Sequence, residues 1–179
     1  MEPGFEAMVR ELYDRQAIRQ VIDRYSRGVD RQDKHILLGC YHSDATDDHG
    51  MFVGPADEFF DWTMPSHLHL FRPGHQHVVT NHVCDLDGNV AHCETYYMFA
   101  GMTVEGNQLG LSGGRYIDRM EKRNGEWKIA ARKCVVEWGN ENMQVEGMAE
   151  VYAAVGKIAC DRSDCSYDRP LLTDPARDG

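Results

Sequence analysis

The stretch from Gln108 to Trp138 decides the fold class: QLGLSGGRYIDRMEKRNGEWKIAARKCVVEW. Asn124-Gly125 is the strongest short hairpin signal, because a type I′ turn needs positive φ at both central residues. The long flanks contain β-branched and aromatic residues, so they predict strands over 108–122 and 126–138. Gly113-Gly114 within the first strand indicates a bulge or sharp bend, which curls a sheet around a cavity.

Two further strands precede this hairpin. Residues 75–86 are rich in β-branched side chains, and the Asp87-Gly88 pair that follows is another two-residue turn signal. Residues 90–102 continue the strand pattern with aromatic side chains, and a second turn follows at 105–107. The sequence therefore predicts a meander of four long antiparallel strands.

Helical patterns come before the strands. Apolar side chains recur every three or four residues over 5–25, which predicts an amphipathic helix of about 20 residues. Shorter helices are predicted over 33–41 and 55–63, separated by a polar, turn-like segment at 42–45 and a short strand at 46–53. Helices followed by a run of antiparallel strands predict an α+β fold, with the helices on one face of a curved sheet.

The end of the chain is less regular. Residues 139–160 are ambiguous, with a weakly helical pattern over 148–158. Residues 161–179 hold five Asp, three Arg and two Pro with few apolar side chains, which predicts a loose tail. We therefore divide the chain into an α+β domain over 1–145 and a C-terminal extension over 146–179, partly helical and then loose.

Composition limits the partners and the compartment. The chain has 179 residues and a net charge of −10, so nucleic acid and anionic membrane surfaces are poor partners. It contains no apolar run near the roughly 18 residues of a membrane span, and its first ten residues lack the pattern of a signal peptide. Six cysteines without a CxxC pair favour reduced thiols, so we expect a cytoplasmic protein.

The chain has nine histidines, and four of them crowd into the segment 67–77. An HxH pair can ligate zinc, but a site also needs a third ligand at a known spacing, and no HExxH, CxxC or EF-hand pattern is present. We therefore expect no metal, and we interpret His67 and His69 as loop residues.

Three polar side chains of the predicted elements are candidates for catalysis. Alternation places His77 and Asn81 on one face of their strand, where His77 is either a proton-transfer group in an apolar pocket or a core histidine with satisfied hydrogen bonds. Asp30 is either a solvated residue after the first helix or a carboxylate that orients a histidine. Alternation from Trp127 predicts that Arg132 faces solvent.

Three motifs in this order resemble the SnoaL-like proteins of the nuclear-transport-factor-like, cystatin-like superfamily. The resemblance covers about residues 8–138 and implies a cone in which N-terminal helices pack on a strongly curved, mostly antiparallel sheet that encloses a pocket. The motifs are Ala17–Gln20 with Arg24–Asp33, His77–Asn81, and Gly113–Asp118 with Asn124–Ile129 and Arg132.

The resemblance is greatest to enzymes of the lindane dehydrochlorinase and scytalone dehydratase type, which are cofactor-free lyases with an Asp–His dyad. It assigns the dyad to Asp30 and His77, and it places Arg132 in the cavity, against the strand pattern. Tyr25 stands where these enzymes have a lysine, so the pocket would suit an oxygenated substrate. By the same comparison Tyr97, Phe99 and Ser112 line the pocket, and His75 and Asn81 border it.

The implied reaction is an elimination: dehydration, dehydrohalogenation or retro-aldol loss of a small aldehyde. His77, held by Asp30, would take a proton from an aromatic or cyclic small molecule, while Arg132 and Tyr25 bind the developing charge. Two alternatives stay open: a non-catalytic ligand-binding protein, and an isomerase or cyclase acting on a polyketide- or steroid-like substrate. The resemblance also implies a homo-oligomer, most often a homotrimer, and no cofactor.

Overall fold

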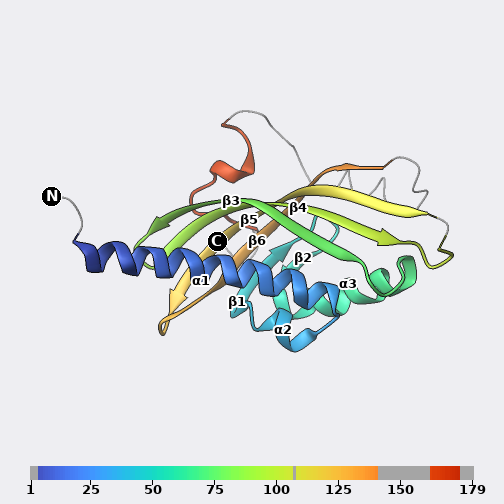
Figure 1. Cartoon of the computed structure of the whole chain (residues 1–179), viewed down its shortest axis with the longest axis horizontal. Coiled ribbons are helices and arrows are strands. Elements are labelled where there is room, and N and C mark those ends of the chain that lie inside the picture. The colour runs from blue at the N-terminus through green and yellow to red at the C-terminus, as the bar shows by residue number, and fades with distance from the viewer. Residues whose placement is uncertain (1–3, 107, 141–161, 174–179) are drawn as a thin grey trace.

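The computed structural model describes residues 4–106, 108–140 and 162–173. Within these residues, three α-helices lie under the arch of one six-stranded curved sheet (Figure 1). The elements in chain order are α1 (Phe5–Asp30), α2 (Lys34–Leu38), β1 (Tyr41–Asp48), β2 (Val53–Pro55), α3 (Ala56–Leu70), β3 (Gln76–Asp87), β4 (Val90–Met102), β5 (Leu109–Arg123), β6 (Glu126–Gly139) and the short 3-10 helix η1 (Cys165–Tyr167). This arrangement confirms the predicted α+β class.

The sheet order is β2-β1-β6-β5-β4-β3. Strands β3 to β6 form the predicted antiparallel meander, with positive φ at Gly88 in one hairpin turn and at Asn124 and Gly125 in the other. Strand β1 pairs in parallel with β6 and antiparallel with the short edge strand β2. The parallel pairing brings a segment from the first third of the chain beside the last strand of the meander.

Paired glycines bend the middle of the sheet, as predicted. The β5–β6 register shifts between Gly113 and Gly114. A Cβ at Gly114 would lie 1.8 Å from the carbonyl oxygen of Val135, and one at Gly113 would lie 2.2 Å from the Trp138 ring. At Gly114 only glycine permits this close approach to the backbone of β6, whereas at Gly113 the absence of a side chain makes room for the Trp138 ring.

The bounds of two early elements differ from the prediction. Strand β1 covers Tyr41–Asp48, where the sequence predicts a polar turn over 42–45 and a strand only from 46. Its polar residues look like a turn locally, but their backbone pairs with β6, a partner that a local pattern does not reveal. Helix α3 extends to Leu70 instead of ending near 63, and it contains Pro65. No described helix combines the length and the apolar character needed to cross a membrane.

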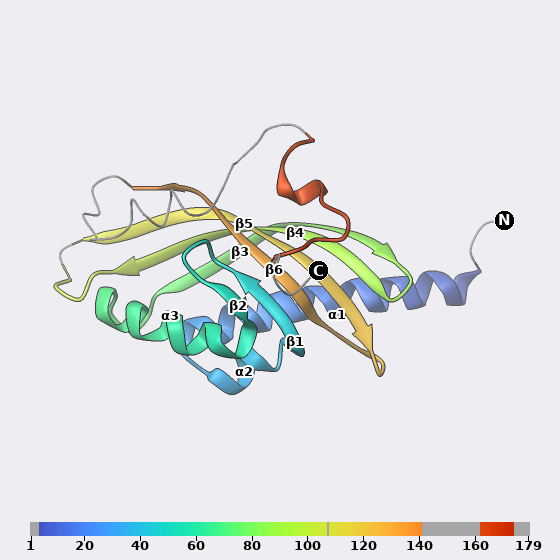
Figure 2. The same cartoon turned by 180° about the vertical axis from the view of Figure 1, so that it is seen from behind.

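Residues 162–173 lie on the face of the sheet opposite to the helices (Figure 2). Two contacts anchor them: Asp164 forms a bidentate ion pair with Arg115 at 2.9 Å, and the fully buried Leu171 packs against Ile117 and Val135. This part of the tail is therefore packed, whereas its composition predicts a loose segment. The predicted helical pattern over 148–158 and the boundary at 145 lie outside the described residues.

This outer face is the one that a homotrimer of the implied type would bury between subunits. Residues 162–173 of the same chain already cover part of it. The homotrimer stays a prediction.

Truncation of Leu171 tests whether the tail contributes to stability. Leu171→Ala should lower the free energy of unfolding by roughly 2–5 kcal/mol, because it removes buried methyl groups and leaves a cavity. The adjacent Leu172 is 53% exposed, so Leu172→Ala should change the free energy of unfolding by no more than about 0.5 kcal/mol. Urea unfolding of both variants measures the difference, and equal small effects would contradict a packed tail.

Candidate active site

An apolar pocket of about 200 Å³ lies between the concave face of the sheet and helices α1 and α3. Aromatic side chains make up much of its wall. They are Tyr25, Phe59, Trp62, Phe71, Tyr97, Phe99 and Tyr116. Ser112 also lines it, so the pocket includes Tyr25, Tyr97, Phe99 and Ser112, which the resemblance assigns to it.

A larger hollow of about 670 Å³ lies beside β1, but its wall is polar. Both arginines in this wall already have acidic partners: Arg123 bonds Asp44 at 2.6 Å, and Arg119 pairs with Glu121. We place the candidate active site in the apolar pocket, where titratable side chains meet an enclosed wall.

Asp30 and His77 form a hydrogen-bonded pair at this pocket. The Nδ1 atom of His77 lies 2.7 Å from Oδ1 of Asp30, and the backbone N–H of His77 donates to both carboxylate oxygens at 3.0 Å. Asp30 ends α1 and His77 is the second residue of β3, so the contact joins the helix to the sheet. With Nδ1–H donated to the carboxylate, Nε2 of this pocket-lining imidazole is free to accept a proton.

Asn81 does not share the pocket with His77. The β3–β4 register shifts between Val79 and His82, so the simple alternation predicted from the sequence ends at Val79. This irregularity leaves Asn81 exposed and turns His82 toward the interior. The expectation that Asn81 borders the pocket is therefore wrong.

Arg132 is fully buried, so the prediction of a solvent-facing side chain is wrong. The β5–β6 register shifts between Arg119 and Met120, and this inserts an extra residue into β6 before Arg132. The guanidinium forms a bidentate ion pair with Asp118, at 2.7 and 2.8 Å. The resemblance places Arg132 in the cavity, but the structure places it behind the wall, outside the pocket lining.

Two tyrosine rings separate Arg132 from the pocket. The guanidinium carbon lies 3.9 Å from the ring centroid of Tyr25 and 4.2 Å from that of Tyr116. Tyr97 stacks on Tyr116 with a centroid distance of 4.5 Å. Burial raises the pKa of all three phenols, so each keeps a hydroxyl proton that can be donated to a substrate oxygen.

A second Asp–His pair lines the pocket, and the sequence reasoning missed it. His49 follows β1, stacks on Phe59 with a centroid distance of 4.2 Å, and bonds the buried Asp47 through Nδ1. The hydroxyl of Tyr41 also donates to Asp47. The only sequence signal is the Asp47-x-His49 spacing, which puts both side chains on one face once residues 41–48 are known to form a strand.

The charge of His49 follows from these neighbours. Burial lowers the pKa of an imidazole, but the negative charge of Asp47, its hydrogen bond and the neighbouring Cys134 together outweigh burial and raise the pKa of His49 to about 10. His49 is therefore an imidazolium at neutral pH. The apolar pocket thus has a cation in its wall, at the position of His49 rather than Arg132.

Two more histidines lie beside His77. His67 lines the pocket from α3, with its ring nearly parallel to that of His77 at a centroid distance of 6.2 Å. The expectation that His67 is a loop residue is wrong because α3 extends past it. His75 is buried 6.2 Å from His77 but does not line the pocket. Burial lowers the pKa of both, to about 3 for His67, so both rings stay neutral.

Comparison with known proteins identifies the relatives of this fold. A family model described as a SnoaL-like domain matches residues 10–133. No curated protein sequence matches the chain significantly.

Solved structures with the same fold include enzymes and proteins of unknown function. The hexachlorocyclohexane dehydrochlorinase LinA-type3 from Novosphingobium barchaimii is 21% identical, with a TM-score of 0.67 over 76% of this chain and 95% of that one. A candidate scytalone dehydratase from Novosphingobium aromaticivorans is 19% identical, with a TM-score of 0.66 over 75% and 91%. A protein of unknown function with a cystatin-like fold from Nostoc punctiforme is 20% identical, with a TM-score of 0.60 over 70% and 92%. At these identities the similarity shows the fold alone.

The charge of His49 can be measured directly by titration of its imidazole resonances in NMR. The signals should show a protonated ring at pH 7 and titrate near pH 10. Asp47→Asn removes the charge that opposes burial, so His49 should then be neutral at pH 7. His92, on the opposite face of the sheet, is the control, and its titration should not change.

The same shift has a consequence for stability. Because the pKa of His49 in the folded state exceeds its ordinary value of 6.5, the pair with Asp47 contributes stability below pH 6.5 that is lost as the pH rises toward 10. A wild-type His49 that titrates at or below pH 6.5 would contradict this assignment.

Proposed function

Because the chain belongs to the family of SnoaL-like domains, we propose that it is a cofactor-independent lyase in which Asp30 and His77 remove a proton from a small cyclic substrate. One observation carries this proposal: Asp30 holds the His77 ring at the wall of an apolar pocket through bonds to both the backbone N–H and Nδ1. These bonds orient the imidazole before substrate arrives, which is what a general base requires.

The proton transfer follows from the orientation of His77. Nε2 accepts a proton from a carbon of the substrate, and the carboxylate of Asp30 stabilises the imidazolium that forms. The electron pair of the broken C–H bond becomes the new double bond. The leaving group departs from the neighbouring carbon with its own electron pair, so the product has lost the elements of water or hydrogen halide. In a retro-aldol reaction, Nε2 would instead take the proton of a substrate hydroxyl: the O–H electron pair forms the carbonyl of the departing aldehyde, the electron pair of the broken C–C bond stays on the remaining fragment, and the imidazolium returns the proton to that carbon.

The leaving group needs a partner on another wall of the pocket. His77 lies on β3, at one edge of the sheet, whereas His49 follows β1, near the other edge. The base His77 and the cation His49 thus line one pocket from different parts of the sheet. This arrangement suits a reaction that breaks bonds at adjacent atoms of the substrate. His49 would stabilise the negative charge of the leaving group or of a carbonyl oxygen, in the role that the resemblance gives to Arg132.

The wall of the pocket indicates the class of substrate. Aromatic side chains favour a flat or cyclic molecule, and the neutral hydroxyl groups of Tyr25, Tyr97 and Tyr116 favour one that carries oxygen. The volume of about 200 Å³ is below the roughly 300–1,000 Å³ of pockets for drug-sized ligands. A substrate with one or two rings therefore suits the pocket better than a steroid.

Arg132 has a positioning role in this proposal. It holds the rings of Tyr25 and Tyr116 from behind, and Asp118 neutralises its charge. The two tyrosines are therefore fixed donors for a substrate oxygen, and the guanidinium itself does not touch the substrate.

Substitution of the dyad separates catalysis from binding. Asp30→Asn and His77→Ala should each lower turnover by about 10²–10⁴-fold, because each removes an element of the general base. Affinity for the same ligand should change only a few-fold. Asp23→Asn, an exposed carboxylate change on α1, and His92→Ala, on the outer face, are matched controls that should keep full turnover.

A substrate panel decides the reaction class. Hydroxylated cyclic ketones and hexachlorocyclohexane, the compound in the name of one structural neighbour, are incubated with the protein, and mass spectrometry follows the products. A product lighter by water, hydrogen halide or aldehyde supports the lyase. A product of unchanged mass supports an isomerase or cyclase, and binding without turnover of any compound supports a non-catalytic binding protein.

A further inference from the structure

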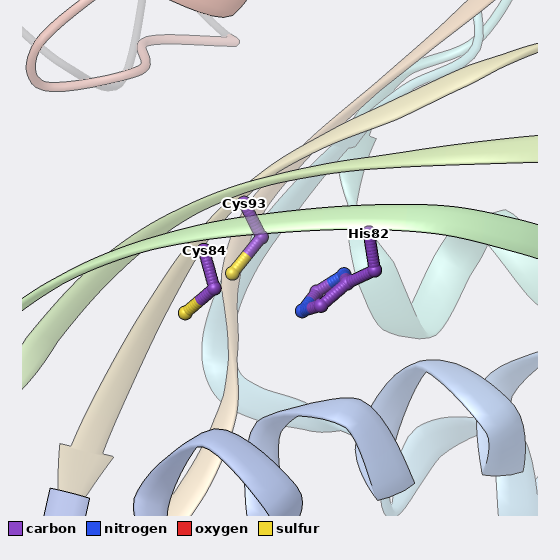
Figure 3. Close-up of side chains that lie close together, drawn as sticks. All are labelled: His82, Cys84 and Cys93. Carbon is purple, nitrogen blue, oxygen red and sulfur yellow. The ribbon is translucent and has the colours of Figure 1, made fainter.

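A cluster of metal-binding side chains lies apart from the pocket. His82 and Cys84 of β3 and Cys93 of β4 place one ligand atom each within 4.8 Å of one another. Figure 3 shows the imidazole and the two thiols on the same side of the strands, in the space between the sheet and helix α1. None of the three residues lines the apolar pocket.

Strand pairing brings the three residues together. Cys84 lies directly opposite Cys93 in the β3–β4 hairpin, and His82 is two residues before Cys84 on the same face. The register shift between Val79 and His82 is what turns this face toward α1. The ligand spacing therefore follows from a bulged hairpin, and it contains none of the short motifs by which zinc sites are usually found.

The His82 ring has the orientation of a metal ligand. Nδ1 lies 2.8 Å from the hydroxyl of Thr95, the fully buried residue opposite His82 on β4. Nε2 is buried and has no hydrogen-bond partner among the described residues. Histidine ligands commonly use one ring nitrogen for such an orienting bond and the other for the metal.

We propose that His82, Cys84 and Cys93 bind a zinc ion. Two thiolates and a neutral imidazole balance the charge of Zn²⁺, whereas they would leave a net negative charge around Cu⁺ in a largely buried site. Zinc–ligand bonds of about 2.0–2.3 Å place ligand atoms roughly 3.5–3.8 Å apart, so a small movement of the side chains closes the site. Both thiols are free to act as ligands.

The site has an open coordination position. No fourth His, Cys, Asp or Glu of residues 4–106, 108–140 and 162–173 joins the cluster. Water or a small anion would complete the tetrahedron. Arg15 of α1 bonds the carbonyl oxygen of Cys84 at 2.7 Å, which holds the helix against this part of the hairpin.

Bound zinc would tie β3 to β4 just after the register shift. His77 lies near the start of the same strand, so the metal would hold the strand that carries the proposed base without entering the pocket. This inference does not depend on the proposed lyase activity.

Metal binding is tested on full-length protein that has been reduced and stripped with a chelator. Added Co²⁺ should produce a thiolate-to-cobalt charge-transfer band and the strong visible bands of a tetrahedral site, saturating at one equivalent. Zn²⁺ should displace the cobalt and raise the melting temperature, because an ion that binds only the folded state stabilises it.

Variants of the three ligands locate the site. Cys84→Ser, Cys93→Ser and His82→Gln should each weaken zinc binding at least about 10²-fold, since even loss of an outer-shell partner costs 10–100-fold. Cys165→Ser and His92→Gln are matched controls outside the cluster, and both should bind zinc as the wild type does. Circular dichroism checks that each variant is folded, and His82→Gln keeps a group that can bond Thr95.

Two results would overturn the proposal. One is reduced wild-type protein that takes up no cobalt or zinc, whether or not Cys84 and Cys93 form a disulfide on oxidation. The other is a double variant, Cys84→Ser with Cys93→Ser, that gives the same cobalt spectrum and zinc affinity as the wild type.

Discussion

The bond between Asp30 and His77 is the constraint on which the site depends. A carboxylate at the C-terminal end of a helix is unfavourable, because it faces the negative end of the helix dipole. Asp30 offsets this cost by accepting from the backbone N–H and from Nδ1 of His77. The same carboxylate therefore fixes where β3 begins against α1 and which nitrogen of the imidazole is free. The Asp30 side chain therefore serves both the fold and the proposed chemistry.

Register shifts decide which other side chains reach the interior. Turn signals are local, so Asp87-Gly88 and Asn124-Gly125 predict the four long strands correctly, and Gly113-Gly114 predicts the bend in β5. The shifts near Asn81 and Arg132 have no glycine to mark them, because they arise from pairing with a neighbouring strand. Beyond each register shift, the alternation counted along the sequence consequently assigns side chains to the wrong face of the sheet. Asn81 turns outward, Arg132 turns inward, and the face of β3 that carries His82 and Cys84 turns toward α1.

Contacts between residues distant in sequence explain the other features that the sequence pattern did not predict, which are the His49 pair and the packed tail. His49 is a candidate site residue because of its bond to Asp47, and Asp47 is buried because β1 pairs in parallel with β6. The local sequence does not show this pairing. The tail is a second case: its composition predicts a loose segment, yet Asp164 pairs with Arg115 and Leu171 packs against an apolar patch on the outer face of the sheet. A few long-range contacts outweigh a local preference, and a single sequence does not display them.

The buried charges of the domain explain how an acidic chain can have a cation in the wall of an apolar pocket. Asp118 neutralises Arg132, and the two tyrosine rings that cover the guanidinium offset part of its desolvation. Asp47 is completely buried, and its charge is compensated by His49 and by the hydroxyl of Tyr41. Each of these two carboxylates is therefore occupied by its own partner. In the proposed reaction, a substrate oxygen would meet the imidazolium of His49 and neutral phenols, an arrangement that favours developing negative charge.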